Sequence, residues 1–477
     1  MPSLRIMNLL NSIEGQTING ESLQTALADV GLSAQLESLL ATRGVGRRAA
    51  NNTVTVATII GSARATDLVF KNASPLNSFI AQNIVIQSAA MSGLAALPAS
   101  LNVIFSNATA QGLFLGSPYF ETNIKSIIVK LTDSVTVVLE TYADVAALMT
   151  NAVAVPQIIA KPYAIKATSL SVGAMVAAVG STTTMNSIFG DAAASALMAA
   201  STVAQSRIAG STTAMVALRL SSIGMASAAS SKAFVTAIYA VPAAWTSFKA
   251  SAFFADNLKN VVANLAGLNP TSFATLNDII ASASALASVA GSVGAMEALI
   301  TDATAVTTLS NSANLSVVAG NSVAMGVIAP SSAVNALVAN VTSLGTLFAS
   351  AVAKTALFAS PAGMVAAINA NAGSRAYLKG IQTLLLSSTA PFAGVWVPFA
   401  SGLPAKILMM TYRQQGIGAI ETPIKFRSPE SVQLSMVGTA AIGDQIGRDH
   451  VGTYSNLEFN TTAISAITGS GIGYIAM

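Results

Sequence analysis

The chain has 477 residues, of which 53% are apolar and only 9% are charged; its formal net charge is +4 and it has no cysteine. This apolar content excludes a disordered chain, and the lack of cysteine excludes disulfides, thiolate catalysis and cysteine metal sites. Ser, Thr, Asn or Gly interrupts every apolar run before the roughly 20 residues that a membrane span needs. We therefore expect a soluble protein without membrane insertion.

The first 51 residues have the most ordinary composition, with a helical apolar pattern through Leu23, Leu27 and Val30. The apolar run from Ile6 to Leu10 is too short for the core of a secretion signal, so we expect synthesis in a cytoplasm. The one tight basic cluster consists of Arg43, Arg47 and Arg48. It is interpreted either as a solvated linker or as a docking patch for an acidic partner surface. We predict an N-terminal attachment segment over residues 1–51.

Residues 52–386 repeat a degenerate ten-residue pattern. Its clearest copies begin Ser171-Val-Gly-Ala-Met, Ser181-Thr-Thr-Thr-Met and Ser211-Thr-Thr-Ala-Met. Apolar residues stand at positions four, five, eight and often nine of each unit, as in Met185 and Ile188, and these spacings fit one face of an α-helix. The Ser, Thr, Asp or Asn at position one is a natural N-cap. Each unit is therefore predicted to be a cap, about seven helical residues and a turn.

One continuous helix is excluded, because ten residues at roughly 100° each rotate equivalent positions by about 80° per unit and no seam persists. Helices this short are marginal alone, so neighbouring units must bury each other's apolar faces. We predict a mainly α fold, a solenoid of very short antiparallel helices, with a parallel β-solenoid as the alternative. One residue is gained between Leu268 and Ile279, and one is lost between Leu309 and Val318. Prolines fall at unit edges, where they do no harm: Pro242, Pro270, Pro330 and Pro361.

Residues 387–477 have a different composition, with strand-like segments bounded by Gly and Pro, and are predicted to form a small β-rich C-terminal domain. Its aromatic residues are candidates for a contact surface, although packing in the core explains them as well: Tyr412, Phe426, Tyr454 and Phe459. The single histidine, His450, follows Asp449 without a nucleophile motif, so we interpret it as structural. No metal-ligand cluster or phosphate-binding loop occurs in the sequence. We expect no enzyme activity, no cofactor and no nucleic-acid partner.

The Ser-x-x-Ala-Met decapeptides resemble tandem repeats in virion structural proteins of tailed bacteriophages, especially tail-fibre-like and other fibrous appendage proteins. The clearest matches are Ser171 to Val179, Ser211 to Leu218 and Asn321 to Ala329, and degenerate copies cover about two thirds of the chain. The resemblance implies a homo-oligomer, often a trimer, that is attached to the virion through one end. It transfers no functional residue, because the shared pattern is a packing pattern.

These observations predict a virion component made in the host cytoplasm that acts by assembly with other virion proteins. A tail fibre, a collar or whisker fibre and a baseplate component are all compatible with the sequence. The alternative is a fibre that recognises a host receptor, a surface glycan or protein, through its C-terminal domain. A bacterial surface adhesin is a third interpretation, which the missing export signal disfavours.

Overall fold

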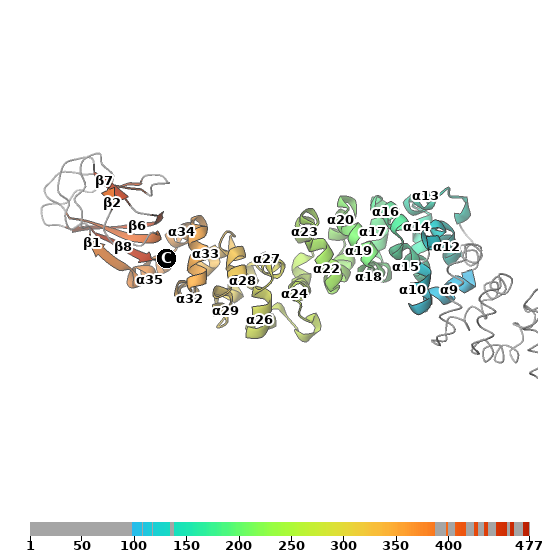
Figure 1. The fold of residues 1–477 in the computed structure, drawn as a ribbon, viewed down its shortest axis with the longest axis horizontal. Coiled ribbons are helices and arrows are strands. Elements are labelled where there is room, and N and C mark those ends of the chain that lie inside the picture. Colours follow the sequence, from blue (N-terminus) through green and yellow to red (C-terminus); the bar gives the residue numbers. More distant parts are fainter. Residues whose placement is uncertain are drawn as a thin grey trace, which may run out of the picture. The chain divides into compact units, whose positions relative to one another are not determined.

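The computed structural model describes residues 98–106, 108–116, 118–133, 138–386, 397–398, 406–415, 424–427, 434–436, 445–455, 458–461 and 471–476. The predicted attachment segment and the first predicted repeats lie outside these residues. The chain divides into two compact units, Met1–Asn257 and Leu258–Met477, and α24 (Phe254–Leu265) crosses the division. Both units are dominated by short helices in their described parts, which confirms the mainly α fold and excludes the β-solenoid (Figure 1).

The described helices of the first unit are α9 (Pro98–Ser106), α10 (Ala108–Leu115), α11 (Pro118–Thr122), α12 (Ile124–Thr132), η1 (Leu139–Thr141), α13 (Val145–Thr150), α14 (Ala154–Ile159), α15 (Pro162–Leu170), α16 (Val172–Val179), α17 (Thr182–Gly190), α18 (Ala192–Ala200), α19 (Thr202–Ala209), α20 (Thr212–Arg219), α21 (Ser222–Ser230), α22 (Lys232–Tyr239) and α23 (Pro242–Lys249). Those of the second unit are η2 (Pro270–Ser272), α25 (Leu276–Ala281), α26 (Ala283–Ala290), α27 (Val293–Leu299), α28 (Ala303–Ser310), α29 (Leu315–Ala319), α30 (Ser322–Ile328), α31 (Ala333–Ala339), α32 (Val341–Ala349), α33 (Ala351–Ala359), α34 (Pro361–Ala370) and α35 (Ala372–Ile381).

Burial follows the ten-residue period. In α17 the buried residues are Thr184, Met185, Ile188 and Phe189, which occupy positions four, five, eight and nine. The same four positions are buried in α18 and α21. At position one, the side chain of Ser181 accepts a hydrogen bond from the backbone N–H of Thr184, as an N-cap does. The predicted unit of cap, short helix and turn is therefore confirmed.

In three pairs of successive helices, the second helix turns by about a right angle from the first. The angles are 95° between α15 and α16, 102° between α30 and α31, and 101° between α32 and α33. The expectation of antiparallel neighbours is therefore wrong for these pairs. One or two residues separate most successive helices of the stack, so the chain bends without a loop long enough to reverse it.

Three bends of this size nearly complete a circle, and within each unit most helices of the stack lie on the helix three before them. One face contains α14, α17, α20 and α23, and the second contains α15, α18 and α21. The third contains α13, α16, α19 and α22. The second unit repeats this order, for example in α25, α28, α31 and α34. One coil of the solenoid is therefore three decapeptides long.

Serine caps also join one coil to the next. The Oγ atom of Ser221 donates to the backbone oxygen of Phe189, 32 residues earlier, at 2.6 Å. We call such a bond, from a cap serine to the position-nine carbonyl of the preceding coil, an interlayer clasp. The cap serines that make one are Ser201, Ser211, Ser221, Ser231, Ser251 and Ser350, at 2.5 to 2.8 Å. The acceptors lie in last turns of helices, where carbonyls lack a partner within the helix.

The two predicted slips of the period coincide with local changes in the helices. The gained residue falls between α24, which has twelve residues, and α25, where a loop containing η2 intervenes. The lost residue falls near α29, which has only five residues. Pro242 and Pro361 are the first residues of α23 and α34, as expected for proline at a helix start.

The described strands are β1 (Thr383–Leu386), β2 (Val397–Pro398), β3 (Lys406–Gln415), β4 (Ile424–Arg427), β5 (Leu434–Met436), β6 (Gln445–Ser455), β7 (Glu458–Thr461) and β8 (Gly471–Ala476). They form two antiparallel sheets, in the orders β1-β8-β3-β6 and β2-β7-β4-β5. The first sheet lies against α34 and α35 through β3, β6 and β8. Because β1 pairs with β8, strand structure begins a few residues before the predicted boundary at residue 387.

Within the described residues no single helix is both long and apolar enough to cross a membrane. Three bent pairs of successive helices reach the necessary length and composition together.

Candidate functional surfaces

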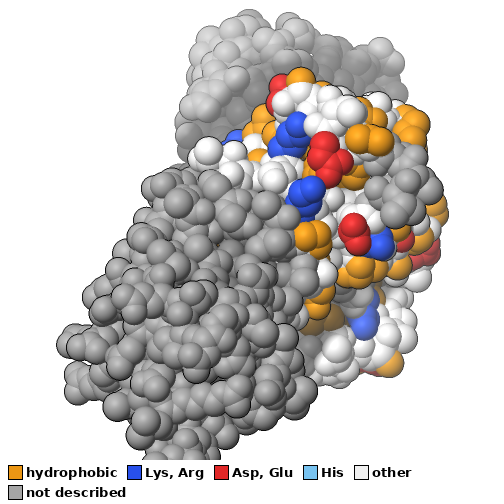
Figure 2. All heavy atoms as spheres, turned by 90° about the vertical axis from the view of Figure 1, so that its right-hand side faces the viewer, with side chains coloured by type: hydrophobic (Ala, Val, Ile, Leu, Met, Phe, Trp, Pro, Cys, Tyr) orange, Lys and Arg blue, Asp and Glu red, His pale blue; other side chains and the backbone are white. Residues whose placement is uncertain are grey.

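The outward positions of the repeat carry small and uncharged side chains. From Val172 to Lys249 the charged residues are Asp191, Arg207, Arg219, Lys232 and Lys249. Exposed apolar side chains stand singly on this surface, including Val176, 52% exposed, and Leu220, 68% exposed. Figure 2 views the face of the first unit that carries α9, α10, α12 and α13, where positively and negatively charged side chains lie near one another among hydrophobic and uncharged polar ones. The surface of the helices from Val172 to Lys249 therefore has little charge with which to recognise an ionic ligand.

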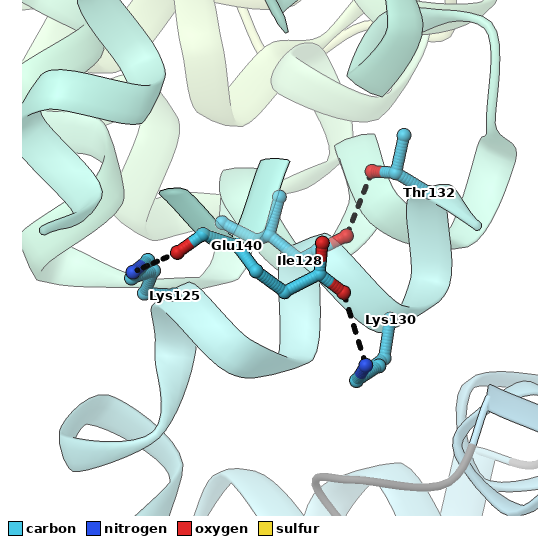
Figure 3. Close-up of polar contacts among 5 residues, drawn as sticks. All are labelled: Lys125, Ile128, Lys130, Thr132 and Glu140. Carbon is cyan, nitrogen blue, oxygen red and sulfur yellow. Dashed lines mark hydrogen bonds and ion pairs between the residues drawn. The ribbon is translucent and has the colours of Figure 1, made fainter. Parts of the chain in front are cut away.

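A small ion-pair cluster fastens η1 to α12 (Figure 3). The Lys130 Nζ lies 3.0 Å from the Glu140 Oε1, and the Lys125 Nζ donates to the backbone oxygen of Glu140 at 3.0 Å. The hydrogen bond from Lys130, followed by a backbone hydrogen bond, lowers the pKa of the Glu140 carboxyl. The side chain of Glu140 is 57% exposed, so this pair fixes local geometry and contributes little stability.

A carboxylate caps helix α16 from a distant part of the chain. The Glu121 Oε1 accepts from the backbone N–H of Val172 at 2.8 Å, and its Oε2 accepts from the Ser171 Oγ at 2.7 Å and from the Gly173 N–H at 3.2 Å. Negative charge is favourable at a helix N-terminus. Ser171 thus donates to Glu121 of α11, whereas the clasp serines donate to a carbonyl of the preceding coil.

Lys166 makes a similar long-range contact. Its Nζ donates to the backbone oxygen of Phe105, in the last turn of α9, at 3.0 Å. Burial lowers the pKa of the Lys166 amine. Lys166 and Glu121 each join the region from α9 through α11 to the first regular coils of the repeat. The sequence does not predict either contact, because each one pairs residues about 50 or more positions apart.

Aromatic side chains gather at the last described coil of the first unit. The ring of Trp245 lies edge-on to Tyr239 and Phe254 and is stacked on Phe248, with centroids 5.3 to 6.1 Å apart. The Lys249 Nζ lies 5.2 Å from the Trp245 ring centroid, a cation–π contact. Trp245 is 5% exposed, so this cluster is core packing rather than an open binding platform.

The four predicted C-terminal contact residues lie on two different sheets. Tyr412 in β3 and Tyr454 in β6 belong to the first sheet, where their register partners are Arg448 and Ile407. Phe426 in β4 and Phe459 in β7 belong to the second sheet and stand directly opposite each other. The structure therefore brings two of the four residues into register and places the other two elsewhere.

The remaining predicted positions add no chemical site. The docking patch Arg43, Arg47 and Arg48 lies outside the described residues. His450 lies in β6 beside a shift in the pairing of β3 with β6, between Met409 and Thr411. Among the described residues no group of three or more His, Asp or Glu side chains could hold a metal ion.

No protein-family model matches this chain, and no curated protein sequence matches it.

Proposed function

We propose that this protein is a non-enzymatic structural component of a phage virion, an elongated tail or neck appendage that acts through assembly. The observation that carries the proposal is the use of polar side chains in the repeat body. Its cap serines and aspartates bond to their own helix or to the neighbouring coil, and they leave an outward surface of Ala, Thr, Ser and Val. Such a body is a scaffold, and its function depends on the proteins with which it assembles.

The proposal places specificity at the two ends of the chain. Residues 1–51 attach the protein to other virion proteins, and the strands after Thr383 form the terminal region. A homo-oligomer, with a trimer favoured, fits a surface of this kind, because uncharged residues can be covered by a second copy without desolvating charges. A tail fibre, a collar or whisker fibre and a baseplate component are all compatible with this arrangement of an attachment segment, a repeat body and a terminal region.

The proposal is tested by locating the protein in particles. Antibodies against the purified full chain should label one end or the neck of purified phage particles in immunogold electron microscopy. Light scattering after size exclusion should give a multimer. A monomer at high concentration, together with no label on any particle, would reject the assembly role.

A second candidate is recognition of a host receptor, favoured by the Phe426 and Phe459 pair in the second sheet. A full-length Phe426→Ser variant should then lose binding to host cells while remaining an oligomer. Tyr454→Ser, at a predicted contact residue of the first sheet, tests whether that sheet contributes to binding as well. Loss of the oligomer in the Phe426 variant would favour assembly over recognition.

A further inference from the structure

The few charges on the regular coils of the first unit are almost all positive. Between residues 151 and 250 the one acidic side chain is Asp191, and the basic side chains are Lys161, Lys166, Arg207, Arg219, Lys232 and Lys249. Residues 276–381 of the second unit are balanced, with Asp278, Glu297 and Asp302 against Lys354, Arg375 and Lys379. Positive potential is therefore concentrated on the coils of the first unit.

The carboxylates near these coils are used within the fold, whereas two of the cations are not. The Asp191 carboxylate accepts from the backbone N–H of Ala194 at 2.8 Å, and Glu121 caps α16. Arg207 lies in the last turn of α19, and Lys232 is the first residue of α22. Both are exposed, and within the part of the chain that the structure describes no hydrogen bond or ion pair holds either side chain. Their charges are therefore free to meet a partner.

These two cations share a face with exposed apolar side chains. Helices α16, α19 and α22 stack on one another in the third face of the solenoid. Val172 and Val176 of α16 are 41% and 52% exposed. We call Arg207, Lys232 and these two valines the basic face. Sparse charges of one sign beside apolar side chains suit a partner segment whose opposite charges are equally sparse, rather than a compact ionic ligand.

The chain itself contains a segment of this kind. Residues 6–42 contain no basic residue, and their acidic residues stand seven or eight positions apart: Glu14, Glu21, Asp29 and Glu37. Leucines lie between them, including Leu23 and Leu27. A chain of this length can span up to about 120 Å, whereas three stacked helices cover only about 30 Å. The acidic segment is therefore long enough to cross the whole basic face.

We propose that residues 6–42 of one copy dock on the basic face of a second copy. This inference rests on the proposed assembly role and names the partner of the attachment segment. Opposite charges bring the segment to the face, and contact between leucines and the exposed valines removes apolar surface from water. In its own chain, residues 43–171 separate the segment from this face, whereas a second copy can present the face to it directly.

Self-association of the full-length protein, measured by sedimentation and light scattering, gives the first test. Contacts between exposed charges weaken in salt, so the dissociation constant should rise at least about tenfold between about 0.05 M and about 0.5 M salt. An oligomer whose affinity does not change with salt would overturn this docking and leave the homo-oligomer of the proposed function in place. A monomer in both salts would overturn both.

Charge reversal on the basic face gives the second test. Arg207→Glu combined with Lys232→Glu should weaken self-association at least about tenfold in low salt. Lys161→Glu combined with Lys354→Glu makes the same change in net charge away from the basic face, and it should weaken self-association less than about twofold. An equal loss in the two double variants would show a general charge effect and overturn the docking.

Reversal of the segment then identifies the docked pair. Glu21→Lys combined with Asp29→Lys should also weaken self-association by itself. A mixture of this variant with the Arg207 and Lys232 double variant should regain tight association, because each segment then meets a face of opposite charge on the other variant. If both variants have the helical circular dichroism of the wild type and their mixture stays dissociated, the docking is wrong. Docking within one chain would also give no mixed species.

Discussion

Replacement of Ser221 by alanine should destabilise the protein by about 2 kcal/mol. The Ser221 Oγ accepts from the Gly224 N–H at 2.9 Å and donates to the Phe189 oxygen at 2.6 Å. Loss of a serine cap costs about 1 kcal/mol. Leaving the Phe189 carbonyl without its partner adds about 1 kcal/mol.

Two companion variants separate these contributions. Ser222→Ala changes the adjacent exposed serine, whose side chain makes no hydrogen bond to any residue that the structure describes, and should leave stability within about 0.5 kcal/mol. Ser221→Asp keeps a cap acceptor, as Asp191 does for α18, but cannot donate to Phe189. It should therefore lose at least the contribution of the clasp. The free energy of unfolding from urea titrations followed by far-UV circular dichroism measures all three. A Ser221→Ala variant as stable as Ser222→Ala would refute the clasp as a stabilising bond.

Three further changes have defined outcomes. Gly224→Ala should lower the melting temperature, because the new Cβ atom would lie 3.0 Å from the Phe189 ring, and this crowding should cost more than the helix-propensity gain of about 1 kcal/mol. Gly326→Ala should raise the melting temperature, because no atom lies within 4 Å of its new Cβ atom. A lower melting temperature in both variants would contradict this. Hydrogen bonds from Thr275 lower the pKa of the Asp278 carboxyl at the start of α25. The ionised carboxylate therefore stabilises the folded protein above the unfolded-state pKa of this group, and this contribution is lost as the pH falls through the folded-state pKa. Urea midpoints at neutral and acidic pH should show a smaller acid-induced loss in Asp278→Asn than in the wild type, and an equal loss would exclude this carboxyl. Glu140→Gln should cost no more than about 0.5 kcal/mol in low salt and nothing measurable in high salt, since the pair with Lys130 is exposed; a cost that persists in salt would indicate a role beyond the ion pair.

The sequence predicted the local units well and their arrangement only in part. A cap at Ser181 and buried positions at Met185 and Ile188 follow from the ten-residue period, because helix periodicity is a property of a single unit. The angle between units depends on the linking residues and on packing, which the period does not encode. The three-helix coil and the bond from Ser221 to Phe189 therefore became visible only in the structure.

The candidate sites were less predictable for the same reason. Phe426 and Phe459 face each other through strand pairing across a gap of more than 30 residues, and no sequence signal sets that register. Glu121, which caps α16, comes from a short helix outside the clear repeats. A lone glutamate in such a segment has no distinguishing neighbours in the sequence.

The three-helix coil also limits how the body can change in length. Loss of a single decapeptide within a stack would move every later helix to the next face of the coil. Arg207, for example, would then lie on a different face from the one that it occupies now. Loss or gain of three decapeptides would return each helix to its own face and each cap serine to a carbonyl of equivalent position. The stack can therefore shorten or lengthen by thirty residues without reorienting the surface that follows, and an oligomer built on one face would tolerate only steps of that size.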